Sequence, residues 1–221
     1  MLTNAQEKLI RSLHRSKGRA ETGLCLVEGA KVIETAGDAI DFTFTAVDTP
    51  DFAQLVTTET PQEIAAVARV PNWSEADLAD SPTLVVLDGV QDPGNVGSIL
   101  RLCLGFGATL LLIESADVTS PKVVRSSVGA MFLVPWLKMK PEDAEKYLSA
   151  SRRQIFRLEK NDRAVSPDVL GGEERIALIA GSEGSGINLP IAGTSVEIPH
   201  DQRLESLNVT HAIAIALYAR Q

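Results

Sequence analysis

Three glycine-rich or polar segments of this 221-residue chain each follow an expected strand, and their side chains and main chain are suited to holding a ligand. The segments are residues 88–95, 181–186 and 199–208. Short apolar runs are typical of buried parallel strands, and parallel sheets bind their ligands at the carboxyl ends of the strands. The sequence therefore places its candidate chemistry where strands of a sheet end.

The middle segment, Gly181-Ser182-Glu183-Gly184-Ser185-Gly186, could hold a nucleotide with its main chain. However, its Gly-x-x-Gly-x-Gly order reverses the dinucleotide-binding pattern, and no Lys-Ser/Thr pair follows to form a phosphate loop. Neither Rossmann-type hydride transfer nor phosphoryl transfer is therefore supported. Taken alone, the segment fits an ordinary tight turn as well as it fits a ligand site.

Together, the three segments resemble the three motifs of the SpoU, or TrmH-like, RNA ribose 2'-O-methyltransferases. The residues that resemble motifs 1, 2 and 3 are, in turn, 91–101 with 106–108, 181–187, and 198–199 with 206–209. Residues 125–132 are also similar to the segment that links these motifs in the family. The resemblance extends over residues 84–220 in the family's order and spacing.

This resemblance implies both a fold and a reaction. The fold is α/β, a parallel sheet covered by helices with a C-terminal trefoil knot, as in the SPOUT superfamily. S-adenosylmethionine would bind in a bent form at the knot, and its methyl group would pass to a ribose 2'-hydroxyl of RNA. The resemblance also implies a homodimer whose site takes residues from both subunits.

The resemblance assigns roles to individual residues as well. The predicted catalytic residues are Asn95, Arg101, Glu183, Ser206 and Asn208, and the predicted cofactor-binding residues are Gly181, Gly184, Ile198, Pro199 and Leu207. In the family the arginine is proposed to help activate the hydroxyl, but a guanidinium stays protonated and is a poor base. We therefore expect Arg101 to hold an RNA phosphate and to stabilise the developing alkoxide. A structural ion pair between Arg101 and Glu183 is the alternative.

The elements that must position these residues alternate along the C-terminal part of the chain, as expected for a parallel sheet covered by helices. The expected strands are residues 84–87, 109–113, 134–137, 154–158, 176–180 and 195–198, and the expected helices are 96–106, 121–131, 141–152 and 208–220. The last helix is apolar nearly all round and must be buried on more than one side, within the subunit or at a homodimer contact.

The N-terminal part resembles an L30e-like RNA-binding domain, on residues 12–19, 27–29 and 58–62. We expect this domain to cover residues 1–72, a polar linker to cover 73–82, and the methyltransferase domain to cover 83–221. Because the N-terminal part resembles that of members that modify ribosomal RNA, ribosomal RNA is the expected substrate. A transfer RNA enzyme, or a non-catalytic RNA-binding or ribosome assembly factor, remains an alternative.

The distribution of charge narrows how RNA could be bound. A net charge of -8 argues against a continuous basic coat. Six of the seven bases among the first 80 residues nevertheless fall before position 32, and residues 8–19 have the spacing of a basic amphipathic helix. The predicted RNA contacts are Arg15, Lys17, Arg19 and Arg125. A solvated helix face without a partner is the alternative.

Neither the cysteines nor the histidines suggest a metal. Cys25 and Cys103 lie in apolar runs, which predicts reduced core residues, and the three histidines show no metal-ligand spacing. The first residues contain no apolar signal segment, and no later run approaches the roughly 20 residues that span a bilayer. We therefore expect a cytoplasmic protein.

Overall fold

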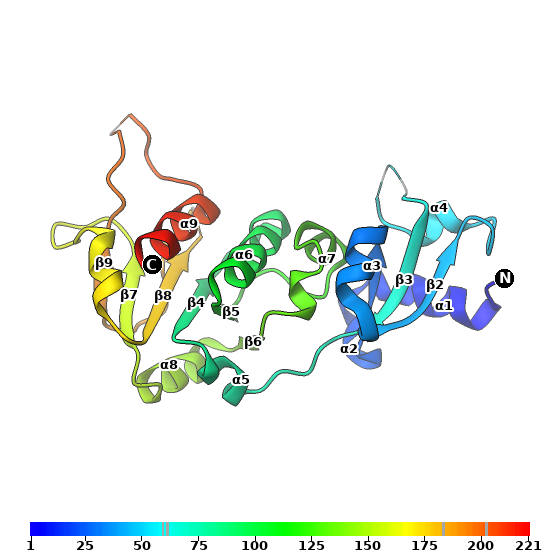
Figure 1. Ribbon diagram of the computed structural model, residues 1–221, viewed down its shortest axis with the longest axis horizontal. Helices are drawn as coiled ribbons and strands as arrows, with labels where there is room; N and C mark the ends of the chain where they lie inside the picture. Colours follow the sequence, from blue (N-terminus) through cyan, green and yellow to red (C-terminus); the bar gives the residue numbers. More distant parts are fainter. Residues whose placement is uncertain (59, 61, 183, 202) are drawn as a thin grey trace. The chain divides into compact units, whose positions relative to one another are not determined.

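The computed structural model describes every residue except Glu59, Pro61, Glu183 and Gln202. The chain divides into two compact units, whose elements are labelled in Figure 1. Met1–Asn72 and Asp117–Leu133 form one, here called the N-terminal unit, and Trp73–Ala116 and Val134–Gln221 form the other, the C-terminal unit. Residues 117–133, expected in the methyltransferase domain, thus pack with the N-terminal residues.

The N-terminal unit is built on an antiparallel sheet of three strands in the order β1-β3-β2. The strands are β1 (Leu24–Glu28), β2 (Ile40–Thr45) and β3 (Ile64–Arg69), and the helices are α1 (Asn4–Leu13), α2 (Ser16–Thr22), α3 (Ala30–Ala36), η1 (Gly37–Ala39), α4 (Phe52–Leu55), α7 (Pro121–Ser126) and η2 (Ala130–Phe132). A core that includes Ile10, Leu26, Phe44 and Val67 joins α1 to the sheet. The unit therefore has an apolar core of its own.

Two helix expectations are corrected here. The basic segment 8–19 is not one helix, because the chain is extended at Arg15 and restarts as α2. Gly18 lets the two helices approach closely, since a Cβ there would lie 2.2 Å from the carbonyl oxygen of Ser12. The helix expected at 121–131 ends at Ser126, because Val128 and Gly129 adopt positive φ values of 51° and 85°.

The C-terminal unit is built on a sheet of six parallel strands in the order β6-β5-β4-β8-β7-β9. The strands are β4 (Thr83–Asp88), β5 (Thr109–Ile113), β6 (Trp136–Met139), β7 (Gln154–Leu158), β8 (Ile176–Gly181) and β9 (Thr194–Val196), and the helices are α5 (Glu75–Asp80), α6 (Pro93–Phe106), α8 (Pro141–Ala150), η3 (Pro167–Gly172) and α9 (Val209–Ala219). This sheet confirms the predicted parallel α/β architecture.

Helices cover both faces of this sheet, which explains its continuous apolar strands. Along β8, Ala177 and Ile179 pack with side chains of α5 and α8, whereas Ile176 and Leu178 pack with Ala216 of α9. Successive strand residues point to opposite faces, so α5 and α8 lie on one face and α9 on the other. Helix α6 packs beside α9 and against β5 (Figure 1).

The stretch expected to be a linker contains a helix. Ser74 and Asp77 form a capping box at the start of α5, and Leu78 is buried in the core of the C-terminal unit. The buried guanidinium of Arg153 donates to the carbonyl oxygens of Leu78, Ser81 and Pro82 at 2.7 to 3.0 Å. These hydrogen bonds fasten the connection between α5 and β4 to the sheet.

Both cysteines are buried and free, as predicted. Burial raises the pKa of Cys25 and of Cys103 to about 12, so both remain protonated thiols. Within the described residues, none of the helices combines the length and the apolar character that a membrane span requires.

Candidate functional site

The site is built where β4, β8 and β9 of the C-terminal unit end. Asp88, the last residue of β4, lies opposite Gly181, the last residue of β8, in the parallel register. Val196, the last residue of β9, lies opposite Leu158 of the neighbouring strand β7. Because the strands are parallel, their carboxyl ends lie on the same side of the sheet, and the three predicted segments leave the sheet on that side.

Asp88 fastens the second segment to the end of β4. Its side chain is 3% exposed, and its Oδ2 accepts hydrogen bonds from the backbone N–H groups of Asn188 at 2.6 Å and Leu189 at 2.7 Å. Its carbonyl oxygen accepts a third, from the N–H of Ser182. Sequence reasoning did not assign Asp88 to the site, although an acid that ends an apolar run before a glycine was a usable signal.

The glycines of the second segment allow a close turn. A Cβ on Gly181 would lie 2.1 Å from the carbonyl group of Gly186, so only glycine fits there. The hydroxyl groups of Ser182 and Ser185 lie 2.8 Å apart, and the amide of Asn188 donates to Ser185. Gly184 is exposed. The predicted catalytic residue Glu183, and with it the suggested ion pair to Arg101, lies outside the described residues.

The first and third segments meet through side-chain hydrogen bonds. Asn95, in the first turn of α6, accepts at Oδ1 from the amide of Asn208 at 3.1 Å and from the hydroxyl of Thr210 at 3.2 Å. Asn208 caps α9, because its Oδ1 accepts from the N–H of Thr210. The predicted residues Asn95 and Asn208 therefore lie together, and Thr210 joins them without having been predicted.

Arg101 is exposed on α6 and makes no hydrogen bond or ion pair with the described residues. It lies six residues after Asn95, which turns it to a different side of the helix. Three other arginines of this unit use their donors within it: Arg153 and Arg220 donate to carbonyl oxygens, and Arg157 is paired with Glu159. As far as the structure describes the chain, protein acceptors do not use the donors of the Arg101 side chain.

A cavity of about 150 Å³ lies between the ends of β7 and β9, the segment that follows β9, and α9. Its apolar lining consists of Leu158, Val196, Ile198, Leu207 and Ala212. Of the predicted site residues, Ile198, Ser206 and Leu207 line it, whereas Gly181, Gly184 and Pro199 do not. The carbonyl oxygen of Ile198 lies 2.7 Å from Nδ1 of His200, which donates to it in the Nδ1–H tautomer.

The charged side chains around this cavity are mainly acidic. Among the described residues that line it, Glu159, Glu197 and Glu205 are acidic, and Lys160 lies 3.6 Å from Glu197. The hydrogen bond from Arg157 lowers the pKa of Glu159, so this carboxylate stays ionised. Arg157 and Lys160 balance two of these carboxylates, so the lining keeps a small negative charge, which disfavours a phosphate.

The predicted RNA contacts in the N-terminal unit fall into two groups. Arg15 and Lys17 are exposed and line a groove of about 380 Å³ with Lys8 and Arg11. Arg19 is instead buried, 5% exposed, and donates to Asp117 at 2.5 Å and to the carbonyl oxygen of Leu13 at 2.8 Å. The prediction that Arg19 contacts RNA is therefore corrected, because protein acceptors already use its donors.

Arg125, the fourth predicted RNA contact, is partly occupied. Its guanidinium lies 2.9 Å from a carboxylate oxygen of the buried Glu28 and donates to the hydroxyl of Thr57. About a third of its side chain remains exposed. Its first role in the structure is thus to neutralise Glu28 at the end of β1.

Comparison with known proteins assigns the class. Residues 82–218 match the SpoU rRNA methylase family, and this match covers more than half of the chain. The chain therefore belongs to the SpoU rRNA methylase family.

Individual relatives agree with this assignment. The chain is 28% identical to the 23S rRNA (guanosine(2553)-2'-O)-methyltransferase RlmP of Bacillus subtilis, over 97% of this chain and 95% of that protein. It is 34% identical to the 23S rRNA (adenosine(1067)-2'-O)-methyltransferase of Streptomyces azureus, over 79% of this chain and 68% of that protein. An AdoMet-bound rRNA methyltransferase from Sinorhizobium meliloti has a similar structure, with a TM-score of 0.82 and 27% identity, over 100% of this chain and 95% of that one.

Proposed function

We propose that this protein is an S-adenosylmethionine-dependent methyltransferase that methylates a ribose 2'-hydroxyl of ribosomal RNA. The observation that carries the proposal is the arrangement at the carboxyl edge of the C-terminal sheet. There, a hydrogen bond between Asn95 and Asn208 joins the first and third segments, and a small acidic cavity opens beside the end of β9. Relatives named as ribosomal RNA 2'-O-methyltransferases support the substrate.

The cavity has the character that this cofactor requires. S-adenosylmethionine carries a sulfonium and an ammonium against one carboxylate, and its adenine is flat and partly apolar. Glu205 suits the net positive charge, while Ile198, Leu207 and Ala212 supply the apolar wall. The volume of about 150 Å³ is below the usual 300 to 1,000 Å³, so the cavity takes part of the molecule.

The cofactor, when bound, supplies an electrophilic methyl group, and the residues of the chain have to place and activate the hydroxyl. Arg101 holds its protonated guanidinium toward solvent, where it binds a phosphate of the RNA and stabilises the oxygen as negative charge develops. Ser206 and the amide of Asn208 help to position the hydroxyl and the donor. A correctly held hydroxyl accounts for much of the rate in such a transfer.

Homodimerisation is part of the proposal. Helices α6 and α9 pack beside each other, and they leave Leu104, Ile215 and Tyr218 exposed by 46%, 41% and 74%. Apolar side chains gathered on neighbouring helices suggest a contact surface. Because Arg101 lies on α6 as well, a second subunit on these helices would adjoin the reacting groups.

Two further features of the family belong to the proposal. We propose that the C-terminal unit contains a C-terminal trefoil knot, and that the N-terminal unit serves as an L30e-like RNA-binding module. The groove lined by Lys8, Arg11, Arg15 and Lys17 supports the second role, because it collects cations on one side of that unit.

Methyl transfer to separated RNAs tests the proposal. The protein is incubated with methyl-labelled S-adenosylmethionine and with deproteinised large-subunit ribosomal RNA, small-subunit ribosomal RNA or transfer RNA. We expect label in ribosomal RNA, in a linkage that resists alkaline cleavage because the 2'-oxygen is methylated. Label in transfer RNA alone would favour a transfer RNA enzyme. Calorimetry without detectable binding of S-adenosylmethionine would instead indicate a non-catalytic RNA-binding factor.

A further inference from the structure

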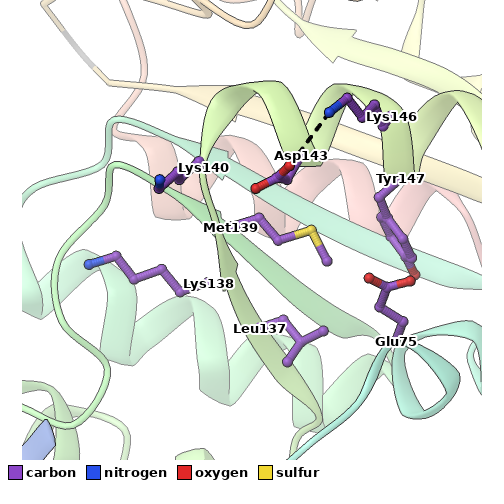
Figure 2. A pocket seen from close by; sticks show the side chains of 8 residues that line it. All are labelled: Glu75, Leu137, Lys138, Met139, Lys140, Asp143, Lys146 and Tyr147. Atoms are coloured by element: carbon purple, nitrogen blue, oxygen red, sulfur yellow. Dashed lines mark ion pairs between the residues drawn. The ribbon is translucent and has the colours of Figure 1, made fainter.

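A second cavity of the C-terminal unit lies at the other end of its sheet. Strand β6 is one edge strand and β9 is the other, with four strands between them. At about 4.8 Å per strand, the two edges are about 24 Å apart. The cavity measures about 650 Å³ and is formed by β6, the residues after it, α8 and Glu75 of α5 (Figure 2). It is therefore separate from the site at β7 and β9.

The cations of this cavity, here called the β6 cavity, lack strong acidic partners. Lys138 and Lys140 are exposed, and neither forms an ion pair with a described residue. Lys146 lies 3.8 Å from Asp143, but both side chains are mostly exposed, and such a pair contributes little. Figure 2 shows the ammonium groups of Lys138 and Lys140 projecting to the same side. The cavity thus presents neighbouring positive charges to solvent.

An aromatic ring stands at the other end of the same cavity. Tyr147 of α8 is half-buried, and burial raises the pKa of its phenol, so the group stays uncharged. Figure 2 shows its hydroxyl end near the carboxylate of Glu75, with Leu137 and Met139 between the ring and the lysines. A cavity lined by cations and by an aromatic side chain suits a single-stranded nucleic acid, because phosphates bind the cations and bases stack on aromatic rings.

The edge position of β6 helps to choose between occupants. An edge strand offers unpaired backbone groups that could add a strand from another protein, but exposed lysines along an edge disfavour such pairing. The same lysines favour a polyanion. A nucleic acid therefore fits the β6 cavity better than a peptide strand does.

We propose that the β6 cavity is a second RNA-contact surface, where Lys138 and Lys140 hold backbone phosphates of a single-stranded segment and Tyr147 stacks on one of its bases. The surface rests on the proposed function, because the RNA is the substrate of the methyl transfer. It lies apart from the methylated nucleotide and increases the affinity of the protein for the flanking RNA. Two contacts on one RNA bind more tightly than either alone when the RNA spans both.

The test compares two double variants with the same loss of charge. Lys138→Gln with Lys140→Gln removes the cations of the cavity, and Arg152→Gln with Arg163→Gln removes two exposed cations elsewhere in the same unit. Binding of a fluorescent 20-nucleotide oligouridylate and of deproteinised large-subunit ribosomal RNA is measured between 50 and 200 mM salt. For the oligouridylate, we expect the lysine variant to reduce the slope of log affinity against log salt by about 1.4, as two lost phosphate contacts predict, and the arginine control to leave it unchanged.

A third variant tests the aromatic contact. Tyr147→Leu keeps the apolar packing and removes the ring face, and it should weaken oligouridylate binding about fivefold or more without changing the salt slope. Calorimetry of S-adenosylmethionine binding and size-exclusion elution should be the same for all variants.

The outcomes separate this proposal from the proposed function. Equal salt slopes in the lysine and arginine variants overturn the RNA surface, while methyl transfer by the unmodified protein continues. Aggregation of the lysine variant with an unchanged slope also overturns it, and would show that the lysines only protect the edge strand. If the unmodified protein transfers no methyl group but the lysine variant loses RNA affinity as expected, the proposed function fails and the surface stands.

Discussion

Each of the two units holds a buried arginine, but the two arginines have different partners. In the N-terminal unit, Arg19 is buried and paired with Asp117, and Arg125 is paired with Glu28. In the C-terminal unit, Arg153 is buried against carbonyl oxygens, while Arg101 stands exposed without a described partner. An arginine whose donors are all used by protein acceptors stabilises the fold, whereas an exposed arginine without a described partner can bind a ligand.

Removing Arg101 should give the largest effect of this comparison. Arg101→Ala is expected to reduce methyl transfer by about 100-fold to 1,000-fold, the range seen when one stabilising donor is lost from an active site. Because the side chain makes no described contact, the melting temperature and the affinity for S-adenosylmethionine should stay the same. Arg163→Ala, another exposed arginine, serves as the control. Loss of the fold in the Arg101 variant would show that this arginine is structural after all.

Breaking the Arg19–Asp117 pair should lower the stability of the protein more than its activity. Asp117→Ala leaves the buried guanidinium without its carboxylate and should lower the free energy of unfolding by on the order of 3 kcal/mol. Asp51→Ala, which breaks the exposed pair with Arg11, should cost less than about 1 kcal/mol. Denaturant unfolding measures both. Equal effects would remove the distinction between buried and exposed pairs.

The same pair predicts a pH dependence. Burial raises the pKa of Asp117, but hydrogen bonds from Arg19 and Thr119 outweigh it and hold the pKa below its ordinary value. A carboxyl with a lowered folded pKa stabilises the protein fully above its ordinary pKa of about 4, and the stabilisation is lost as pH falls further. Asp117→Asn should therefore flatten the fall of stability below about pH 4. An unchanged pH profile would contradict the assignment.

Asp88 is a buried acid of the C-terminal unit, and its removal should lower stability. Asp88→Asn keeps the shape but loses a charged acceptor of two short hydrogen bonds, and should cost about 2 kcal/mol. Asp92→Asn is the control, since asparagine caps a helix about as well as aspartate. The Asp88 variant should also bind S-adenosylmethionine more weakly if the segment it holds contacts the cofactor. Calorimetry and thermal unfolding read out the two effects separately.

The smallest effect is expected from the exposed cations of the N-terminal unit. Arg15→Gln with Lys17→Gln removes two cations from the groove and should reduce the salt slope of RNA binding by about 1.4 to 1.8, with no change in stability. Arg19→Gln, by contrast, should destabilise the unit, because its donors are used inside it. A purely electrostatic effect of Arg19→Gln on RNA binding, with unchanged stability, would show that Arg19 contacts RNA.

Sequence patterns predicted most of the parallel sheet. Apolar runs such as residues 109–113 and 176–180 differ from the observed strands by at most one residue, because strands buried on both faces must be apolar throughout. The patterns were less accurate where local backbone geometry determines where a helix ends. Charge spacing suggested one helix over residues 8–19, but the extended Arg15 and the close approach at Gly18 divide it in two.

By itself, the sequence determined the parallel α/β architecture and the family, since strand periodicity and motif order are properties of the chain. Only the tertiary structure decided which polar groups have partners. It showed that Arg19 is paired with Asp117, that Asp88 accepts hydrogen bonds from the segment after β8, and that Asn95 is hydrogen-bonded to Asn208, more than 100 positions away. The physical reason is that burial and hydrogen bonding depend on distances in space, which spacing along the chain does not fix.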